Sequence, residues 1–153
     1  MLSGGECQYA VPDNARRQRP LLTFRSAARL KASVMVKSWT DKLNAAEEAR
    51  IKPSPRSFGD IVEGQSMLVP TARQVDAFMR GIPEGGSMDV RGFRKALAEA
   101  HGAEVTCPVY TGYHLRTVAE AAHEALERGT PIQEIAPFWR VLDEATPTTA
   151  RLT

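Results

Sequence analysis

The chain has 153 residues, of which 42% are hydrophobic and 25% charged, the composition of one globular domain of ordinary size. Its apolar runs are too short to cross a bilayer, and two cysteines, Cys7 and Cys107, are too few for a disulfide framework. These totals argue against a membrane protein and a disulfide-rich secreted scaffold, and we expect a monomer in a reducing, cytoplasmic setting.

The formal net charge of +2 is divided unevenly along the chain. Residues 1–35 hold six Lys and Arg against two acids, whereas residues 36–153 hold fourteen against sixteen. A protein that binds nucleic acid normally replaces phosphate counterions with clustered Lys and Arg. The overall charge of the body therefore does not by itself favour a nucleic-acid partner.

The leading segment, residues 1–35, contains the Arg-rich stretch RRQRPLLTFRSAARLKAS, which has no sustained apolar period. Three interpretations remain open: a disordered basic arm, an organelle-type transit sequence, or sequence upstream of a true start at Met35. We expect a basic, disordered tail.

Residues 36–66 are expected to hold a short helix and then a linker. Trp39, Leu43 and Ala46 fall on one side of a helix within residues 36–50. The stretch IKPSPRSFGD that follows is rich in Pro and Ser, which predicts a linker crossing the surface.

Two short helices are predicted next. Thr71 with Gln74 three residues later is the signature of a capping box, and the helix it starts should end before Pro83. Asp89 predicts the start of the second helix, which Gly102 should end.

A third helix has the clearest periodicity in the chain. Thr111 is predicted to cap it, and apolar residues recur from Leu115 at i, i+3, i+4, i+7 and i+11. Gly129 and Pro131 should end it. The stretch IQEIAPFWRVL then has β-branched and aromatic residues around a proline, which suits an edge strand or wing.

A winged-helix domain over residues 67–153 is the fold that this order of elements predicts. Its three helices make it mainly α, and the small β wing places it in the α+β class. A plain helical bundle is the structural alternative.

Three short segments, in this order, support a resemblance to a known family. VPTARQVDAFMRGIPEGG contains a Gln-Val pair and then Ile-Pro-x-Gly; LRTVAEAA contains Arg116 and Val118. PFWRVL contains Pro137 and Arg140. Over roughly residues 67–142 the chain resembles the DNA-binding domain of the methylated-DNA–protein cysteine methyltransferases. It is also similar to a bacterial group related to those enzymes, sharing Lys-Ser-Trp near the start and Thr-Cys-Pro before the third helix.

The resemblance implies that the chemistry of the family is lost. In the family, PFWRVL corresponds to Pro-Cys-His-Arg-Val, whose cysteine accepts the alkyl group and whose histidine helps to keep it a thiolate. Phe138 stands at the cysteine position and Trp139 at the histidine position. Neither ring can act as a nucleophile, so suicide alkyl transfer is not expected.

A related set, the alkyltransferase-like proteins, lacks the cysteine and is thought to bind alkylated bases without repairing them. By this resemblance Phe138 and Trp139 would line a base pocket, where stacking contributes about 1–3 kcal/mol per base. The alternative is that both rings pack between the wing and the core.

The resemblance also suggests which residues contact DNA. Arg116 matches the family's intercalating arginine. On the same helix, however, Glu120, Glu124 and Glu127 would repel phosphate. The alternative is a solvent-exposed face on which Glu124 pairs with Arg128. The full predicted set is Thr111, Tyr113, His114 and Arg116 on the third helix, Arg91, Arg94 and Lys95 on the exposed side of the second, and Arg140.

Three functional hypotheses follow. The first is a non-catalytic protein that binds double-stranded DNA in repair, with alkylated bases as the lesion-specific version. The second is a winged-helix module that binds a protein partner and no longer binds DNA. The third is an enzyme using Cys107, for which no base and orienting group is visible. His101, His114 and His123 lack the paired spacing of a zinc site, so no metal or other cofactor is expected.

Overall fold

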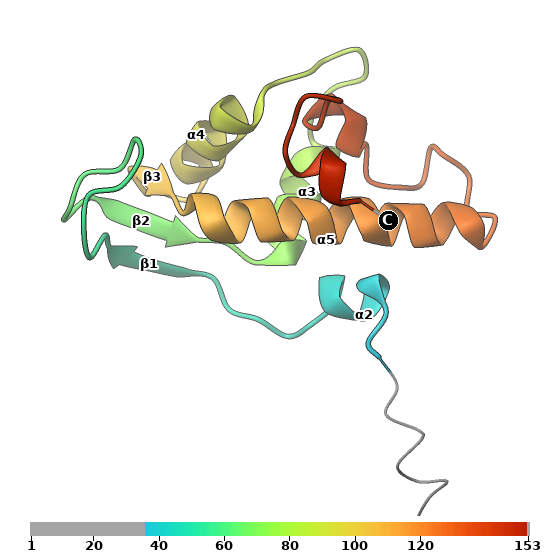
Figure 1. Ribbon diagram of the computed structural model, residues 1–153, viewed down its shortest axis with the longest axis horizontal. Helices are drawn as coiled ribbons and strands as arrows, with labels where there is room; N and C mark the ends of the chain where they lie inside the picture. Colours follow the sequence, from blue (N-terminus) through green and yellow to red (C-terminus); the bar gives the residue numbers. More distant parts are fainter. Residues whose placement is uncertain (1–35, 153) are drawn as a thin grey trace, which may run out of the picture. The chain divides into compact units, whose positions relative to one another are not determined.

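Helices and short strands are interspersed along the chain in the computed structural model, which describes residues 36–152 (Figure 1). Together they make an α+β fold, as predicted. The segment predicted as a basic tail, residues 1–35, lies outside the described residues. The elements are α2 (Trp39–Leu43), β1 (Arg50–Pro53), β2 (Ser66–Val69), α3 (Ala72–Arg80), α4 (Val90–Ala100), β3 (Val105–Thr106), α5 (Pro108–Glu127) and the 3-10 turns η1 (Phe138–Arg140) and η2 (Thr149–Arg151).

The starts of α3 and α4 confirm the predictions made from their capping residues. Thr71 Oγ1 accepts a hydrogen bond from the Gln74 N–H, and Gln74 Oε1 accepts one from the Thr71 N–H, which completes the capping box. Asp89 caps α4 by accepting from the Gly92 N–H at 2.9 Å. Gly102 follows α4 with φ +73°, a left-handed conformation that favours glycine.

The third helix starts earlier than predicted. α5 begins at Pro108, directly after Cys107, and Thr111 lies inside it. The Thr111 hydroxyl donates to the Cys107 carbonyl at 2.7 Å instead of capping the helix. The prediction that Thr111 caps this helix is therefore wrong, because Pro108 fits the first helical position, where its missing N–H costs nothing.

The sheet does not lie where the sequence predicted it. β1 pairs antiparallel with β2, Ile51 standing opposite Leu68, and β2 pairs parallel with β3. The predicted linker therefore contains a strand, and interpreting residues 51–53 as linker was wrong. Pro53 is tolerated because β1 is an edge strand, where one missing donor need not break a ladder.

The predicted strand or wing at residues 132–142 is also wrong. The segment turns through η1, with the Leu142 N–H donating to the Phe138 carbonyl at 2.8 Å. Pro137 has no N–H to give a ladder, and the buried side chains of Ala136 and Val141 point into the core. Local turn bonds and core packing replace strand pairing here.

The core forms where α3, α4 and α5 meet. Val75, Met79, Phe93, Leu97 and Leu115 are fully buried in one cluster. The Phe93 ring also meets the ring of Phe78, edge to face, with centroids 5.2 Å apart. α5 runs through the middle of this arrangement, with α3 packed on one of its sides (Figure 1).

α2 covers the flank of α5 that was expected to face solvent. The Glu124 carboxylate accepts from the Trp39 and Thr40 backbone N–H groups, both at 3.0 Å, and from the Thr40 hydroxyl at 2.9 Å. These donors are the unsatisfied groups of a helix N-terminus. Glu124 does pair with Arg128, at 3.3 Å, but Glu120 is buried. The solvent-exposed interpretation is therefore wrong for the part of α5 under α2, since α2 shields it.

The predicted division at residue 66 is also not seen. The described residues from Lys37 onward cluster as one unit that includes α2 and β1. The reason is that α2 packs on α5, and β1 is hydrogen-bonded to β2.

Candidate functional site

The four predicted DNA-contacting residues of α5 separate into two groups. Thr111 and His114 are buried and do not lie on the outer surface of the helix, where a duplex would contact it. Tyr113 is 54% exposed, and the Arg116 side chain is one-third exposed. The set predicted from the sequence is therefore corrected to Tyr113 and Arg116 at the surface of this helix.

Arg116 is held against its own helix. Its Cζ lies 5.2 Å from the centroid of the Trp39 ring, and its Nε lies 3.5 Å from Glu120 Oε1. Lys42 Nζ lies 3.7 Å from the same ring, so the indole contacts two cations. These contacts fix the direction of the Arg116 side chain before any ligand arrives.

A hollow of about 420 Å³ opens at the start of α5, and we call it the α5 hollow. Two arginines and a tyrosine line it, and no acidic residue is among the described residues that do. Arg151, which the sequence prediction missed, is exposed and makes no ion pair with other residues in the range 36–152. It lies beyond residues 67–142, the range from which the DNA-contacting set was predicted. The lining is Pro108, Val109, Gly112, Tyr113 and Arg116 from α5, with Thr148 and Arg151 from the C-terminal segment.

The predicted basic cluster of α4 is smaller in the structure than in the sequence. The Arg94 side chain is 13% exposed; its Nη2 lies 3.0 Å from Asp60 Oδ1, and its Nε and Nη2 each donate to the Thr106 carbonyl at 3.2 Å. The hydrogen bond from Arg94 holds the pKa of Asp60 below its ordinary value. Arg94 thus ties α4 to β3 and to the Asp60 loop. Arg91 and Lys95 remain exposed.

The two residues of the predicted base pocket do not face the same space. Phe138 packs against the core cluster, whereas Trp139 is 45% exposed. Their ring centroids are 5.4 Å apart at an interplanar angle of 75°. Trp139 borders a hollow of about 370 Å³, which we call the Trp139 hollow; Phe138 does not line it. The other lining residues are Arg80, Glu84, Ile132, Gln133, Ile135, Pro137 and Arg140.

The cations beside the Trp139 hollow already have partners. Arg140 donates from Nη1 to the Ile82 carbonyl. Arg80 pairs with Asp76 at 3.0 Å and donates to the Glu134 carbonyl at 2.9 Å. The Trp139 hollow shares no lining residue with the α5 hollow, so the structure does not join Arg116, Phe138 and Trp139 in one cavity.

Cys107 is buried at the start of α5. Its side chain packs with Ile61 and Met67 in a small apolar cluster. Apolar packing of this kind is typical of a structural thiol. Among residues 36–152, no group of three His, Cys, Asp or Glu side chains is placed to hold a metal ion.

A larger concave region, missed by the sequence prediction, lies beside His114, and we call it the His114 groove. Burial lowers the pKa of His114 below its ordinary value, while the Glu47 carboxylate and the Pro70 carbonyl act to raise it. Glu47 Oε2 lies 3.9 Å from His114 Nε2. The imidazole is therefore expected to be neutral at pH 7.

Comparison of the chain with models of known protein families, with curated proteins and with solved structures gives no match. Within the described residues, no helix is both long and apolar enough to span a bilayer. The candidate sites therefore depend on the geometry of this chain.

Proposed function

We propose that this protein binds double-stranded DNA without catalysis, using a winged-helix-type unit formed by α3, α4 and α5. The observation that supports this best is the α5 hollow, which gathers Arg116, Arg151 and Tyr113 and has no acidic residue among the described residues that line it. Phosphate oxygens accept from arginine and from hydroxyl groups, and most protein–DNA hydrogen bonds go to the DNA backbone. Of the acidic residues expected to repel DNA, Glu120 is buried and Glu124 is hydrogen-bonded to α2, whereas Glu127 is exposed at the opposite end of α5 from the hollow.

Each residue of the α5 hollow has a distinct part in this proposal. Arg151 is exposed and unpaired within residues 36–152, which suits a phosphate contact. Tyr113 presents a ring and a hydroxyl at the same edge. Arg116, oriented by Trp39, would reach the minor or major groove from the third turn of α5. In this proposal the protein acts as a monomer in the cytoplasm.

The resemblance to the alkyltransferase family supports the non-catalytic part of the proposal. Phe138 and Trp139 occupy the positions of the family's cysteine and histidine, and neither ring can accept an alkyl group. In the lesion-specific version, an alkylated base stacks on the exposed Trp139 ring in its hollow of about 370 Å³. Phe138 would support that ring from the core side.

Fluorescence anisotropy of a labelled duplex of about 20 bp, at about 50 and 200 mM KCl, tests the proposal. Arg151→Ala should weaken binding about tenfold. It should also reduce by about one the slope of the logarithm of the binding constant against the logarithm of the salt concentration. Arg56→Ala is the matched control, since Arg56 is also exposed and has no ion pair to another described residue. Absence of binding at the lower salt would refute DNA binding. Equal affinity for plain and O6-methylguanine duplexes would remove the lesion-specific version alone.

A second candidate, a surface for a protein partner, is favoured by one observation. Val109 is 72% exposed, and Tyr110 and Tyr113 are exposed on the same first turns of α5. Exposed apolar and aromatic side chains grouped in this way often mark protein interfaces. The anisotropy experiment separates the candidates, because a protein surface predicts no binding to either duplex at low salt.

A further inference from the structure

The His114 groove is distinct from the proposed DNA surface. Its volume is about 570 Å³, within the range of about 300–1,000 Å³ that is typical of small-molecule sites. None of Tyr113, Arg116 and Arg151 lines it. Its lining is Ala46, Glu47, Glu48, Arg50, Lys52, Val69, Pro70, Thr71, Tyr110 and His114.

Two cations stand together at one wall of the groove. Arg50 and Lys52 are two residues apart on β1, so their side chains point to the same face of the strand. Both are exposed, and neither side chain forms a hydrogen bond or ion pair with another residue of the described chain. A pair of unpaired cations is better matched by the dianion of a phosphate monoester than by a single negative charge.

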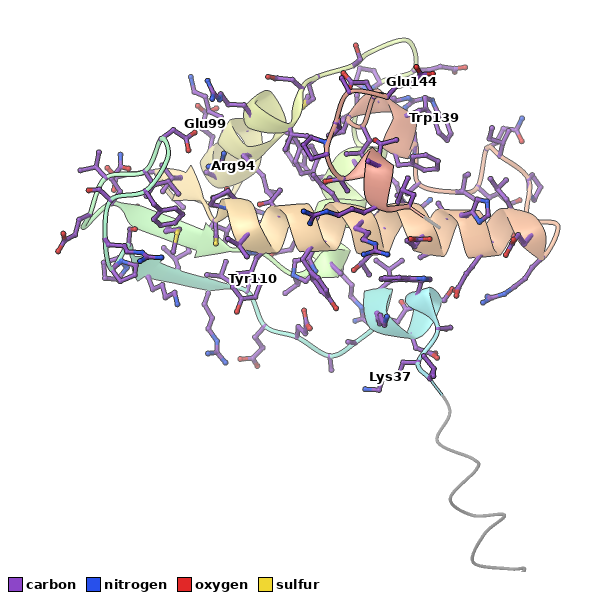
Figure 2. The ribbon with its side chains drawn as sticks, viewed as in Figure 1. Lys37, Arg94, Glu99, Tyr110, Trp139 and Glu144 are labelled. Carbon is purple, nitrogen blue, oxygen red and sulfur yellow. The ribbon has the colours of Figure 1, made fainter. Side chains whose placement is uncertain are left out.

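A planar surface borders the same space. The Tyr110 ring is half exposed and lies 6.2 Å from the His114 ring, tilted by 32° to it. Figure 2 shows Tyr110 at the start of α5, beside β1. Val69 and Pro70 add apolar lining. A flat ligand ring can therefore stack on Tyr110 with apolar atoms close by.

The floor of the groove holds polar atoms that lack close partners. The separation of 3.9 Å between His114 Nε2 and Glu47 Oε2 is longer than a hydrogen bond. His114 is 3% exposed, and its Nδ1 makes no well-formed hydrogen bond within the described chain. Apart from the interaction with the Pro70 carbonyl, the described chain gives the buried imidazole no close polar partner, and a ligand group can supply one. A ligand amine can donate to Glu47 while an adjacent ring nitrogen meets His114.

We propose that the His114 groove binds a nucleoside monophosphate, either free or at the 5′ end of a nucleic-acid strand. Arg50 and Lys52 hold the phosphate, and Tyr110 stacks on the base. Glu47 and His114 recognise the amine-bearing edge of the base. The site is independent of the proposed DNA surface, because the two share no residue.

Calorimetric titration of the full chain tests the assignment with AMP, TMP, adenosine and inorganic phosphate. AMP should bind about tenfold more tightly than adenosine, which lacks the phosphate, and than phosphate, which lacks the ring. TMP, whose base has no exocyclic amine, should bind more weakly than AMP, and Glu47→Gln should remove that preference. No binding of AMP at millimolar concentration would overturn the proposal.

Variants at the surface of β1 locate the binding. The double variant Arg50→Ala, Lys52→Ala should lose at least tenfold in AMP affinity, whereas Arg56→Ala and Arg151→Ala should bind AMP normally. Circular dichroism should show that all fold, since these side chains are exposed. Unchanged affinity in the double variant would overturn the site. Arg151→Ala should weaken DNA binding and leave AMP binding intact. This result would show that the two binding sites are separate, so that failure of one proposal can be told from failure of the other.

The source of the nucleotide is settled by competition with short single strands. If the strand end is the ligand, a 5′-phosphorylated tetranucleotide should displace AMP and its 5′-hydroxyl form should not. If AMP binds and neither strand displaces it, the ligand is the free nucleotide. Equal displacement by both strands would refute recognition of the terminal phosphate.

Discussion

Removal of the Glu124 carboxylate should detach α2 from α5. Glu124 accepts three hydrogen bonds from the first residues of α2 and pairs with Arg128, and 22% of its side chain is exposed. Capping groups of this kind contribute about 1 kcal/mol each, with partial compensation by water when they are lost. We therefore expect Glu124→Ala to lower the free energy of unfolding by about 2–3 kcal/mol, and Glu124→Gln by about 1 kcal/mol.

Urea unfolding followed by tryptophan fluorescence measures this change, since Trp39 lies in α2. Glu127→Ala is the control, because Glu127 lies one turn away, is exposed, and faces His123 at 3.8 Å. It should change the free energy of unfolding by less than about 0.5 kcal/mol. Hydrogen exchange at the Trp39 and Thr40 amides should accelerate in Glu124→Ala and remain slow in Glu127→Ala. Equal losses in the two variants would refute the capping role.

The pH dependence gives a second check on Glu124. Desolvation acts to raise its pKa, but hydrogen bonds from Trp39 and Thr40 and the charge of Arg128 outweigh it and hold the pKa below the ordinary value. A depressed carboxyl pKa stabilises the fold above the unfolded-state pKa and loses that effect as pH falls through the folded-state value. The stability gap between the wild type and Glu124→Gln should therefore be full at pH 7 and shrink below about pH 4.5.

Three further outcomes are expected. Leu97→Ala, at a fully buried position, should lower the free energy of unfolding measured in urea titration by about 3 kcal/mol. The control Val109→Ala, at an exposed position, should lower it by less than about 0.5 kcal/mol. Similar losses in the two variants would contradict the assigned core. Because the folded-state pKa of His114 is depressed, the unfolded chain binds the proton first, and wild-type stability should fall as the pH drops below about 6.5. His114→Asn should lack that fall, and an equal fall would exclude His114 as its source. Trp139→Ala should change stability little but abolish any preference for the O6-methylguanine duplex in anisotropy, and a retained preference would remove Trp139 from lesion recognition.

The features predicted correctly from the sequence are those that depend on residues close together in the sequence. The cap of α3 needs Thr71 and Gln74, and the cap of α4 needs Asp89, all within one turn of the bonds they make. α5 was placed correctly in its body because apolar periodicity is a local pattern. Its start was missed, because Pro108 and Thr111 can each begin a helix and the pattern does not rank them.

The features that were missed depend on distant partners. Residues 50–53 become a strand because β2 lies beside them, which a Pro- and Ser-rich stretch does not reveal. The partners of Arg94, at Thr106 and Asp60, lie on other elements, so an arginine that looked free on its helix is engaged. The His114 groove needs β1, the loop before it and α5 to come together. Composition and periodicity do not contain these pairings.

The outer border of the sheet has a consequence for how this protein behaves at high concentration. An unpaired edge strand can hydrogen-bond to the edge strand of another copy, and repeated pairing of this kind leads to aggregates. Here Pro53 offers no donor, and a second copy aligned along Arg50 and Lys52 would bring positive charges face to face. Mutual repulsion thus discourages accidental polymerisation, and neutral replacements at these two positions should make the purified protein more prone to turbidity in light scattering.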